Sequence, residues 1–305
     1  MNAAPSPGAP AVLNAMTIDV EDYFQVSGFE GLAPRHTWDS FESRVEANTT
    51  RLLNLFDETG LKGTFFVLGW VAERFPHLVK DIAQRGHEVA SHGHLHRLVY
   101  DITRDAFRED IRRSKDVIES ASGRAVLGYR APSYSITPRS LWALDILIEE
   151  GYRYDASVFP IHHDRYGIPP SPREPYVIRR KAGGLIEAPG SAVRVGGWNF
   201  PVGGGGYFRL LPYGWTRWGL NRINKREHRG AIFYLHPWEI DADQPRLPVG
   251  MLGRFRHYRN LAQTEVRLRK LINDFRFGPL QALLSESIEQ VPDAARLSDA
   301  LPYLW

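Results

Sequence analysis

The chain has 305 residues, of which 43% are hydrophobic and 24% charged, which is typical of a folded globular protein and too apolar for a disordered one. Its net charge of +3 is not concentrated in a basic run, so the sequence predicts no nucleic-acid partner. The absence of cysteine excludes disulfides, thiolate zinc sites and a cysteine nucleophile, so a bound metal would need histidine and carboxylate ligands.

The start of the chain, residues 1–12, lacks the charged and apolar regions of a signal peptide, and we expect it to be flexible. No window contains the roughly 18 uninterrupted apolar residues of a membrane span. The sequence therefore favours a cytoplasmic protein with no membrane span.

Short apolar runs then alternate with amphipathic segments. We expect strands at 11–20, 63–69, 86–91, 125–130, 152–158, 184–190 and 230–237, and helices at 43–60, 71–86, 103–123 and 263–275. Gly60 should end the first helix, Thr103 should cap the third, and Thr137 should cap a further helix with Pro138 at its first position. Strands that alternate with helices indicate parallel pairing, and about seven such steps predict an α/β barrel.

Residues 196–212, GGWNFPVGGGGYFRLLP, are rich in glycine and aromatic residues. They lack the Lys-Ser/Thr pair of a phosphate-binding loop. We therefore interpret them as a flexible loop at the surface or beside an active site.

Polar residues follow five of the predicted strands at the same end. These positions are Asp19, the segment 91–96, Arg130, Asp155 and His236. Catalytic residues of (β/α) barrels gather at the C-terminal ends of the strands. We therefore expect these side chains to surround one site.

The segment SHGHLH, residues 91–96, is a candidate metal site. His92 and His96 share one face if the segment is a helical turn, whereas His94 joins them if it is extended. A carboxylate would complete the site, because two histidines and one carboxylate with an open position are what a hydrolytic Zn²⁺ requires. The acidic cluster after the first strand, with Asp19, Glu21 and Asp22, could supply it.

Taken in order, these motifs resemble the polysaccharide deacetylase family, also known as NodB-homology proteins or carbohydrate esterase family 4. The family's Thr-Phe-Asp-Asp, His-(Ser/Thr)-x-x-His, Arg-x-Pro and Leu-x-His motifs correspond to TIDVED, HGHLH, RAPSY and YLHP. The resemblance covers residues 13–240 and implies a distorted (β/α)7-type barrel, with residues 241–305 as a C-terminal extension packed on it. The DVEDYF variant and this extension are similar to a subgroup found with bacterial exopolysaccharide and exosortase gene clusters.

The resemblance implies three catalytic residues. Asp19 would be the general base that deprotonates water, and Arg130 would orient it or balance its charge. His236 would be the general acid that protonates the leaving amine.

It also implies a cofactor, Zn²⁺ or another divalent metal such as Co²⁺, with His92 and His96 as ligands. The family's second aspartate is replaced by Val20, so the third ligand would be Glu21 or Asp22. Five further residues are candidates for contacts with substrate: Ser133, Tyr134, Asp155, Leu235 and Trp238. Asp155 could instead orient His236 or hold a turn.

The family activity is hydrolysis of non-peptide carbon–nitrogen bonds. The sequence thus predicts an enzyme that removes N-acetyl groups from the sugars of a bacterial exopolysaccharide, with an acetylated glycan as its partner. Two alternatives are an amidohydrolase of the same barrel that acts on a small cyclic amide or ureide, and a catalytically inactive glycan-binding protein.

Overall fold

The computed structural model describes residues 12–289. Of the expected flexible terminus, 1–12, residues 1–11 lie outside this range, and so does the end of the expected extension. In the part of the chain that is described, no helix combines the length and the hydrophobicity that crossing a membrane requires.

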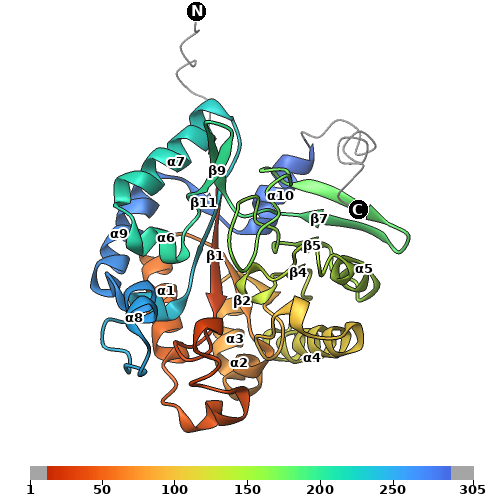
Figure 1. The fold of residues 1–305 in the computed structure, drawn as a ribbon, viewed down its shortest axis with the longest axis vertical. Helices are drawn as coiled ribbons and strands as arrows, with labels where there is room; N and C mark the ends of the chain where they lie inside the picture. The colour runs from red at the N-terminus through yellow and green to blue at the C-terminus, as the bar shows by residue number, and fades with distance from the viewer. Residues whose placement is uncertain (1–11, 290–305) are drawn as a thin grey trace, which may run out of the picture.

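A mainly parallel sheet forms the centre of the molecule (Figure 1). Its parallel strands, in spatial order, are β10 (Ile232–Leu235), β1 (Asn14–Val20), β2 (Thr64–Val67), β3 (Glu88–Ser91), β4 (Gly128–Tyr129), β5 (Tyr154–Asp155) and β7 (Gly183–Glu187). The antiparallel strand β6 (Tyr176–Arg180) completes the edge, and β11 (Phe277–Gly278) pairs with β1. The predicted α/β architecture with a parallel sheet is confirmed.

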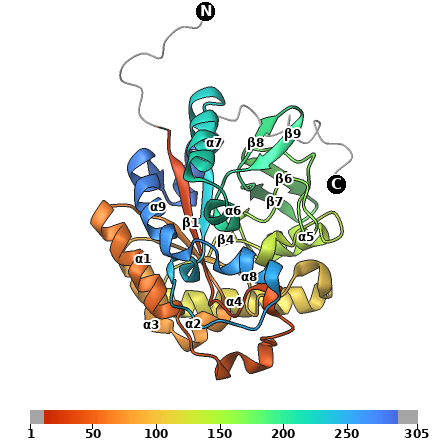
Figure 2. The same cartoon turned by 60° about the vertical axis from the view of Figure 1, so that its left-hand side comes forward.

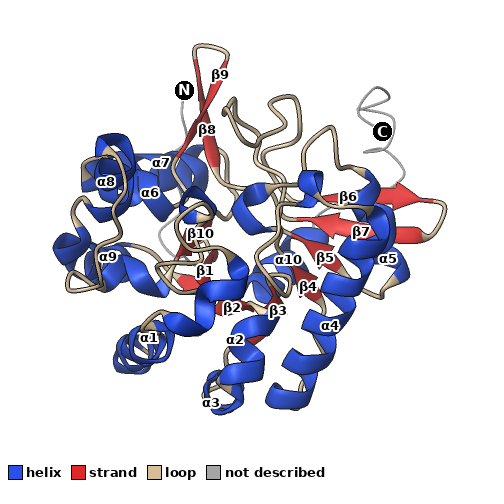
Figure 3. Ribbon diagram, turned by 60° about the horizontal axis from the view of Figure 1, so that its bottom comes forward, coloured by secondary structure: helices blue, strands red, loops and turns tan. Residues whose placement is uncertain are grey.

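The strands follow an arc, and α1 to α5 lie along its outer side (Figure 3). In the described residues the ladder ends at β10 and β6, so it does not close into a regular barrel. Beside β10, the N–H of Tyr234 donates to the carbonyl of Gly203, and the N–H of Ile232 donates to Ser191 Oγ. Irregular chain therefore satisfies this edge of the sheet, which is the distortion of the barrel.

Helices connect most of the strands. The first five are α1 (Val45–Thr59), α2 (Gly69–Arg74), α3 (Pro76–Gln84), α4 (Arg104–Ser122) and α5 (Trp142–Glu149). The helices α6 (Gly205–Leu210), α7 (Tyr213–Arg226), α8 (Met251–Tyr258) and α9 (Leu261–Asp274) gather on one side of the molecule (Figure 2), and α10 (Leu280–Glu289) follows.

Local signals located several helix ends correctly. Gly60 ends α1 in the left-handed conformation with φ 66°, and the Thr103 side chain accepts a hydrogen bond from the N–H of Ala106 at the start of α4. The helix expected from Thr137 begins only at Trp142, because residues 137–140 form a turn closed by Ser140.

Two other expected elements differ from the structure. The helix expected over 71–86 is two helices, α2 and α3, separated at Phe75. The segment 196–212, interpreted as a loop, contains the strand β9 (Trp198–Pro201), which pairs with β8 (Ala192–Val195), and the helix α6. Pairing with a strand earlier in the chain gives part of this glycine-rich segment a regular strand conformation.

Side-chain alternation along β1 separates a core from a site. Met16 and Ile18 point to the outer helices, whereas Ala15 and Asp19 belong to the inner face. At the N-terminal end of the strands α10 packs into the inner face, where its leucines contact small residues. That end is therefore closed by hydrophobic packing, and the polar residues are left at the other end of the strands.

One predicted site residue lies in the core instead. Asp155 is fully buried opposite Glu187 on the neighbouring strand, and it accepts a hydrogen bond from Ser157. Burial raises the pKa of Asp155 to about 6, and burial and the Asp155 charge raise the pKa of Glu187 well above its ordinary value. Asp155 Oδ2 and Glu187 Oε2 are buried without a hydrogen-bond donor, so we expect the two carboxyl groups to share one proton and Asp155 to have a structural role.

This pair should make the protein less stable as the pH rises. Its folded-state pKa values are raised, so its contribution is present below the ordinary carboxyl pKa and is lost as the pH passes through the folded values. Between about pH 5 and about pH 8 we expect the free energy of unfolding to fall by on the order of 2 kcal/mol from this pair. Glu187→Gln keeps the hydrogen bonds and should flatten this dependence in urea unfolding.

The matched control is Glu109→Gln on the exposed face of α4, which should keep the wild-type dependence. Equal pH dependence in the wild type and Glu187→Gln would contradict the shared proton.

Candidate active site

Two buried carboxylates stand at the C-terminal end of β1. Arg130, which directly follows β4, donates from Nη1 to Asp19 Oδ1 over 2.6 Å and to Thr17 Oγ1 over 2.8 Å. Its Nε donates to the carbonyl of Ala156, and the guanidinium lies on the Phe66 ring. Asp19 thus has one oxygen held by a buried cation and the other directed toward the site.

His92 and His96 approach each other in a tight turn. Their ring centroids are 5.4 Å apart. The segment is neither helical nor extended, because Gly93 and His96 adopt left-handed backbone with φ 75° and 50°. His92 Nδ1 donates to the carbonyl of Arg130 over 2.8 Å, which leaves Nε2 free to coordinate a metal.

His94 points away from this pair. Its Nε2 lies 3.7 Å from a carboxylate oxygen of Glu73 on α2, and its N–H donates to Asp110 over 2.6 Å. The turn therefore separates His94 from the other two histidines.

Glu21, rather than Asp22, lies with the histidines. Glu21 Oε2 is 2.7 Å from His96 Nε2 and 4.0 Å from His92 Nε2. Asp22 instead accepts hydrogen bonds from Ser43 and from the N–H groups of residues 44 and 45, where it caps α1. Burial raises the pKa of Asp22 to about 6.

The donor set of Glu21, His92 and His96 fits a divalent metal. One ligand atom from each residue lies within 4.8 Å of the other two. Glu21 Oε2 is buried and, despite its short distance to His96, makes no hydrogen bond of acceptable geometry. Burial lowers the pKa of His92 to about 4, so its imidazole is neutral, as a ligand must be. Burial opposes the charge of Glu21, but His96 and His236 outweigh it and hold the pKa of Glu21 below its ordinary range.

His236 faces the carboxylates from the end of β10. Its Nε2 is 3.6 Å from Glu21 Oε1 and 3.9 Å from Asp19 Oδ2. Its Nδ1 bonds Glu239 over 2.7 Å, and Glu239 in turn pairs with the buried Arg209. Burial disfavours the charged imidazole, but the carboxylates of Glu21, Glu239 and Asp19 raise the pKa of His236 to about 9.

Glu239 was not among the sequence candidates. It follows His236 by three residues in HPWE, a spacing that brings two side chains together in one turn of the 3-10 helix η5 (Pro237–Ile240). That spacing was the available signal. Arg209 carried no such signal, since it lies 30 residues upstream of Glu239.

A cavity of about 150 Å³ connects these groups. Of the predicted substrate contacts, Ser133, Tyr134 and Trp238 line it. Trp238 also donates from Nε1 to Glu21 Oε1 over 3.2 Å. Leu235 is fully buried in the core, and its neighbour Tyr234 lines the cavity instead.

Two backbone positions at this cavity are strained. Ser133 and Tyr134, in the short helix η4 (Pro132–Tyr134), have φ of 51° and 53°. The Ser133 hydroxyl is 2.8 Å from that of Ser27. The loop after β4 is thus fixed in an unusual conformation where it meets the cavity.

Comparison with known proteins finds matches to two separate parts of the chain. Residues 33–154 match the polysaccharide deacetylase family, and residues 156–285 match a domain of unknown function (DUF3473). Over residues 33–154, less than half of its length, the chain is thus similar to the polysaccharide deacetylase family.

Two relatives match part of this chain. The peptidoglycan-N-acetylglucosamine deacetylase of Bacillus cereus is 32% identical over 98 residues, which are 32% of this chain and 36% of the relative. The peptidoglycan deacetylase of Helicobacter pylori is 32% identical over 119 residues, which are 39% of each chain. The chain thus covers less than half of the length of either relative.

Solved structures share the fold over nearly the whole chain. One is described as a "putative polysaccharide deacetylase from Mycobacterium smegmatis", with a TM-score of 0.63, 21% identity and 95% of both chains covered. An allantoinase has a TM-score of 0.61 at 14% identity, with 97% of this chain and 96% of that chain covered. Likeness at these identities shows a common fold and does not choose between reactions.

The metal site gives a direct prediction. Protein stripped of metal should bind Zn²⁺ at one site, and His96→Ala should weaken binding by about 100-fold or more, because one of three ligands is lost. His94→Ala and Asp22→Asn should bind as the wild type does. Isothermal titration measures all four proteins, with thermal melts to check folding. Weakened binding in a folded Asp22→Asn variant would contradict the assignment of Glu21.

Proposed function

We propose that this protein is a metal-dependent N-deacetylase that hydrolyses acetyl groups from N-acetylated sugars of a bacterial exopolysaccharide. The observation that carries the proposal is the position of Asp19 and His236, which face each other across the cavity with their nearest side-chain atoms 3.9 Å apart. Glu21, His92 and His96 line the same cavity. A base, an acid and a set of cation ligands are what amide hydrolysis requires.

Asp19 serves as the general base. Arg130 holds Oδ1, so Oδ2 is the oxygen that takes a proton from the attacking water. Because Arg130 is itself buried and fixed by Thr17, the carboxylate keeps one orientation through the reaction.

His236 serves as the general acid. Its Nε2 faces the cavity, while Glu239 holds Nδ1 and favours the protonated imidazole. The proton at Nε2 goes to the leaving nitrogen when the carbon–nitrogen bond breaks.

Glu21, His92 and His96 would hold the divalent metal, with Zn²⁺ as the expected ion. When bound, such a cation supplies Lewis acidity, which polarises a carbonyl group and lowers the pKa of water. The backbone N–H of Ser133 is our candidate donor to the developing oxyanion. Tyr134 and Trp238 border the space for the sugar.

The polymeric substrate is supported by the relatives, which are named as deacetylases of peptidoglycan, a polymer of N-acetylated sugars. The exopolysaccharide assignment rests on the DVEDYF motif and the long C-terminal region. The chain retains the base, the acid and the metal ligands together, which argues against an inactive glycan-binding protein.

Acetate release tests the proposal. With Zn²⁺, the wild type should release acetate from N-acetylated oligosaccharides, whereas Asp19→Asn should lose about 10²-fold or more of kcat because it lacks the base. Acetate release by Asp19→Asn at the wild-type rate would contradict the mechanism. Turnover of a cyclic ureide in place of acetylated sugars would favour the ureide hydrolase, and glycan binding without any turnover would favour the binding protein.

A second prediction concerns Glu239. Glu239→Gln removes the negative charge beside His236 and should lower kcat by about 10- to 100-fold with little change in KM, because substrate contacts remain. Asp155→Asn, at the residue that the sequence offered for this role, should leave kcat unchanged. If Asp155→Asn lowers kcat and Glu239→Gln does not, the assignment of Glu239 as the residue that orients His236 is wrong.

A further inference from the structure

A second, wider groove of about 660 Å³ continues from the catalytic cavity. The two share Val26, Ser133, His236 and Trp238 as lining residues. One wall of the groove comes from residues 26–32 and another from the segment before and within α8. A polymer with one sugar at His236 therefore places a neighbouring sugar in this groove.

The groove has cationic walls. Its lining includes Arg165, Arg209 and Arg256, and no aspartate or glutamate lines it among the described residues. Arg209 is neutralised by Glu239 and donates to three backbone carbonyls. Arg165 and Arg256 are exposed, and neither forms an ion pair with a carboxylate within residues 12–289.

Arg165 and Arg256 line the same groove although they are far apart in sequence. Burial lowers the pKa of His163, the charge of Asp164 opposes this shift, and the charges of Arg256 and Arg165 add to it. The nearest acid, Asp164, lies 3.0 Å from His163 Nδ1 and partly offsets them. The His163 ring stacks on Tyr166 at 3.8 Å, and Tyr166 lines the catalytic cavity. The two arginines therefore border the way from the cavity into the groove.

The wall formed by α8 is rigid at its base. Arg209 donates to the carbonyls of Arg256, His257 and Arg259, and this guanidinium also pairs with Glu239. The position of the Arg256 backbone is therefore fixed relative to His236 through three successive contacts, from the Arg256 carbonyl to Arg209, from Arg209 to Glu239 and from Glu239 to His236. Val249 and Leu252 add apolar surface to the same wall, against which a sugar ring can pack.

Resting on the proposed function, we infer that the groove binds an anionic group on the sugar next to the N-acetylated one, so that the substrate is an acidic polysaccharide. Arg165 and Arg256 recognise the anion, which is a carboxylate of a uronic acid or a phosphate substituent. The planar guanidinium binds either group through paired N–H donors.

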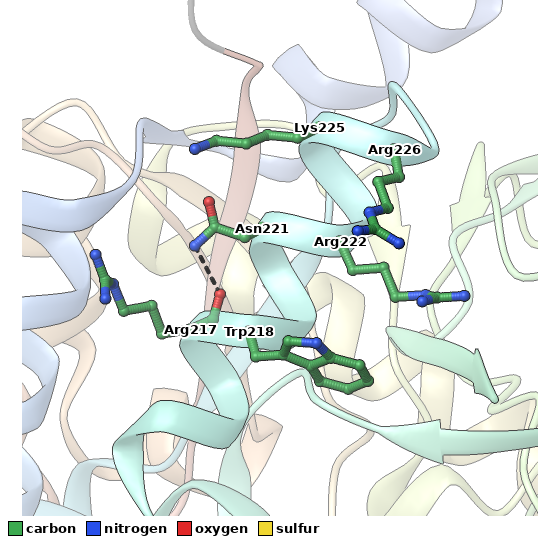
Figure 4. Close-up of a pocket in the computed structure, with 6 residues that line it drawn as sticks. All are labelled: Arg217, Trp218, Asn221, Arg222, Lys225 and Arg226. Atoms are coloured by element: carbon green, nitrogen blue, oxygen red, sulfur yellow. Dashed lines mark hydrogen bonds between the residues drawn. The ribbon is translucent and has the colours of Figure 1, made fainter. Parts of the chain in front are cut away.

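Another cationic surface provides a matched control. On α7, Arg217, Arg222, Lys225 and Arg226 line another hollow together with Trp218 and Asn221 (Figure 4). None of these residues lines the groove or the cavity. Lys225→Gln/Arg226→Gln therefore removes two charges from an exposed face, as Arg165→Gln/Arg256→Gln does at the groove.

Acetate release is measured with three N-acetylated oligosaccharides of equal length, which are neutral, uronate-containing or phosphate-substituted. Wild type should favour an acidic oligosaccharide over the neutral one by about five- to tenfold in kcat/KM, mainly through KM, and added salt should reduce the preference. Arg165→Gln/Arg256→Gln should lose the preference and keep the wild-type kcat on the neutral oligosaccharide. The α7 control variant should keep both the preference for acidic oligosaccharides and the wild-type kcat on the neutral one. The better of the two acidic substrates identifies the anion.

Equal kcat/KM for the three substrates, or loss of the preference in the α7 control as well, would overturn the inference. The affinities of the acidic and neutral oligosaccharides, measured by calorimetry, test the inference separately from the proposed function. If no acetate is released but wild type binds an acidic oligosaccharide that Arg165→Gln/Arg256→Gln does not, the function fails and the inference stands. If the neutral oligosaccharide is hydrolysed and the acidic ones bind no better, the inference fails and the function stands.

Discussion

The contact between Arg130 and Asp19 is the constraint on which the rest of the site depends. Alternation along β1 places Asp19 and Glu21 on the same side at the C-terminal end of this strand, and both side chains are buried. Two buried carboxylates so close together are costly unless cations or hydrogen bonds compensate them. Arg130, directly after β4, compensates the charge of Asp19. Its backbone carbonyl accepts a hydrogen bond from Nδ1 of His92. One residue therefore fixes both the proposed base and a proposed metal ligand.

The buried negative charge of Glu21 is compensated in a different way. Trp238 donates to Oε1, while Oε2 faces His92 and His96 without a proper hydrogen bond. A carboxylate left in this state is stabilised by positive charge in the space between the three side chains, which a divalent cation provides. The structural requirement to neutralise the end of β1 and the chemical requirement for an electrophile thus coincide. The charge of Asp22 is compensated by hydrogen bonds instead, because its Oδ2 accepts from Ser43 Oγ and from the N–H groups of residues 44 and 45 at the start of α1.

The sequence predicted the fold and most of the site because strand-end positions follow from local patterns. The parallel sheet, the helix end at Gly60 and the grouping of Asp19, His92 and His96 could all be predicted from short motifs. Alternation along the strand favours Glu21, but the sequence left Asp22 open as well, since the choice depends on where the chain turns toward the start of α1. The partner of Asp155 could not be predicted from the sequence either, because only the register of β5 with β7 brings Glu187 opposite Asp155.

The site also joins parts of the chain that family comparison separates. The polysaccharide deacetylase match, residues 33–154, holds His92, His96 and Arg130 but begins after Asp19 and Glu21. His236, Glu239 and Arg209 lie within the match to a domain of unknown function, residues 156–285. Because β10 of this region pairs with β1, His236 reaches the cavity that β1 and β3 supply. The region without an assigned function is therefore a structural part of the candidate active site, and neither matched region holds all of its residues.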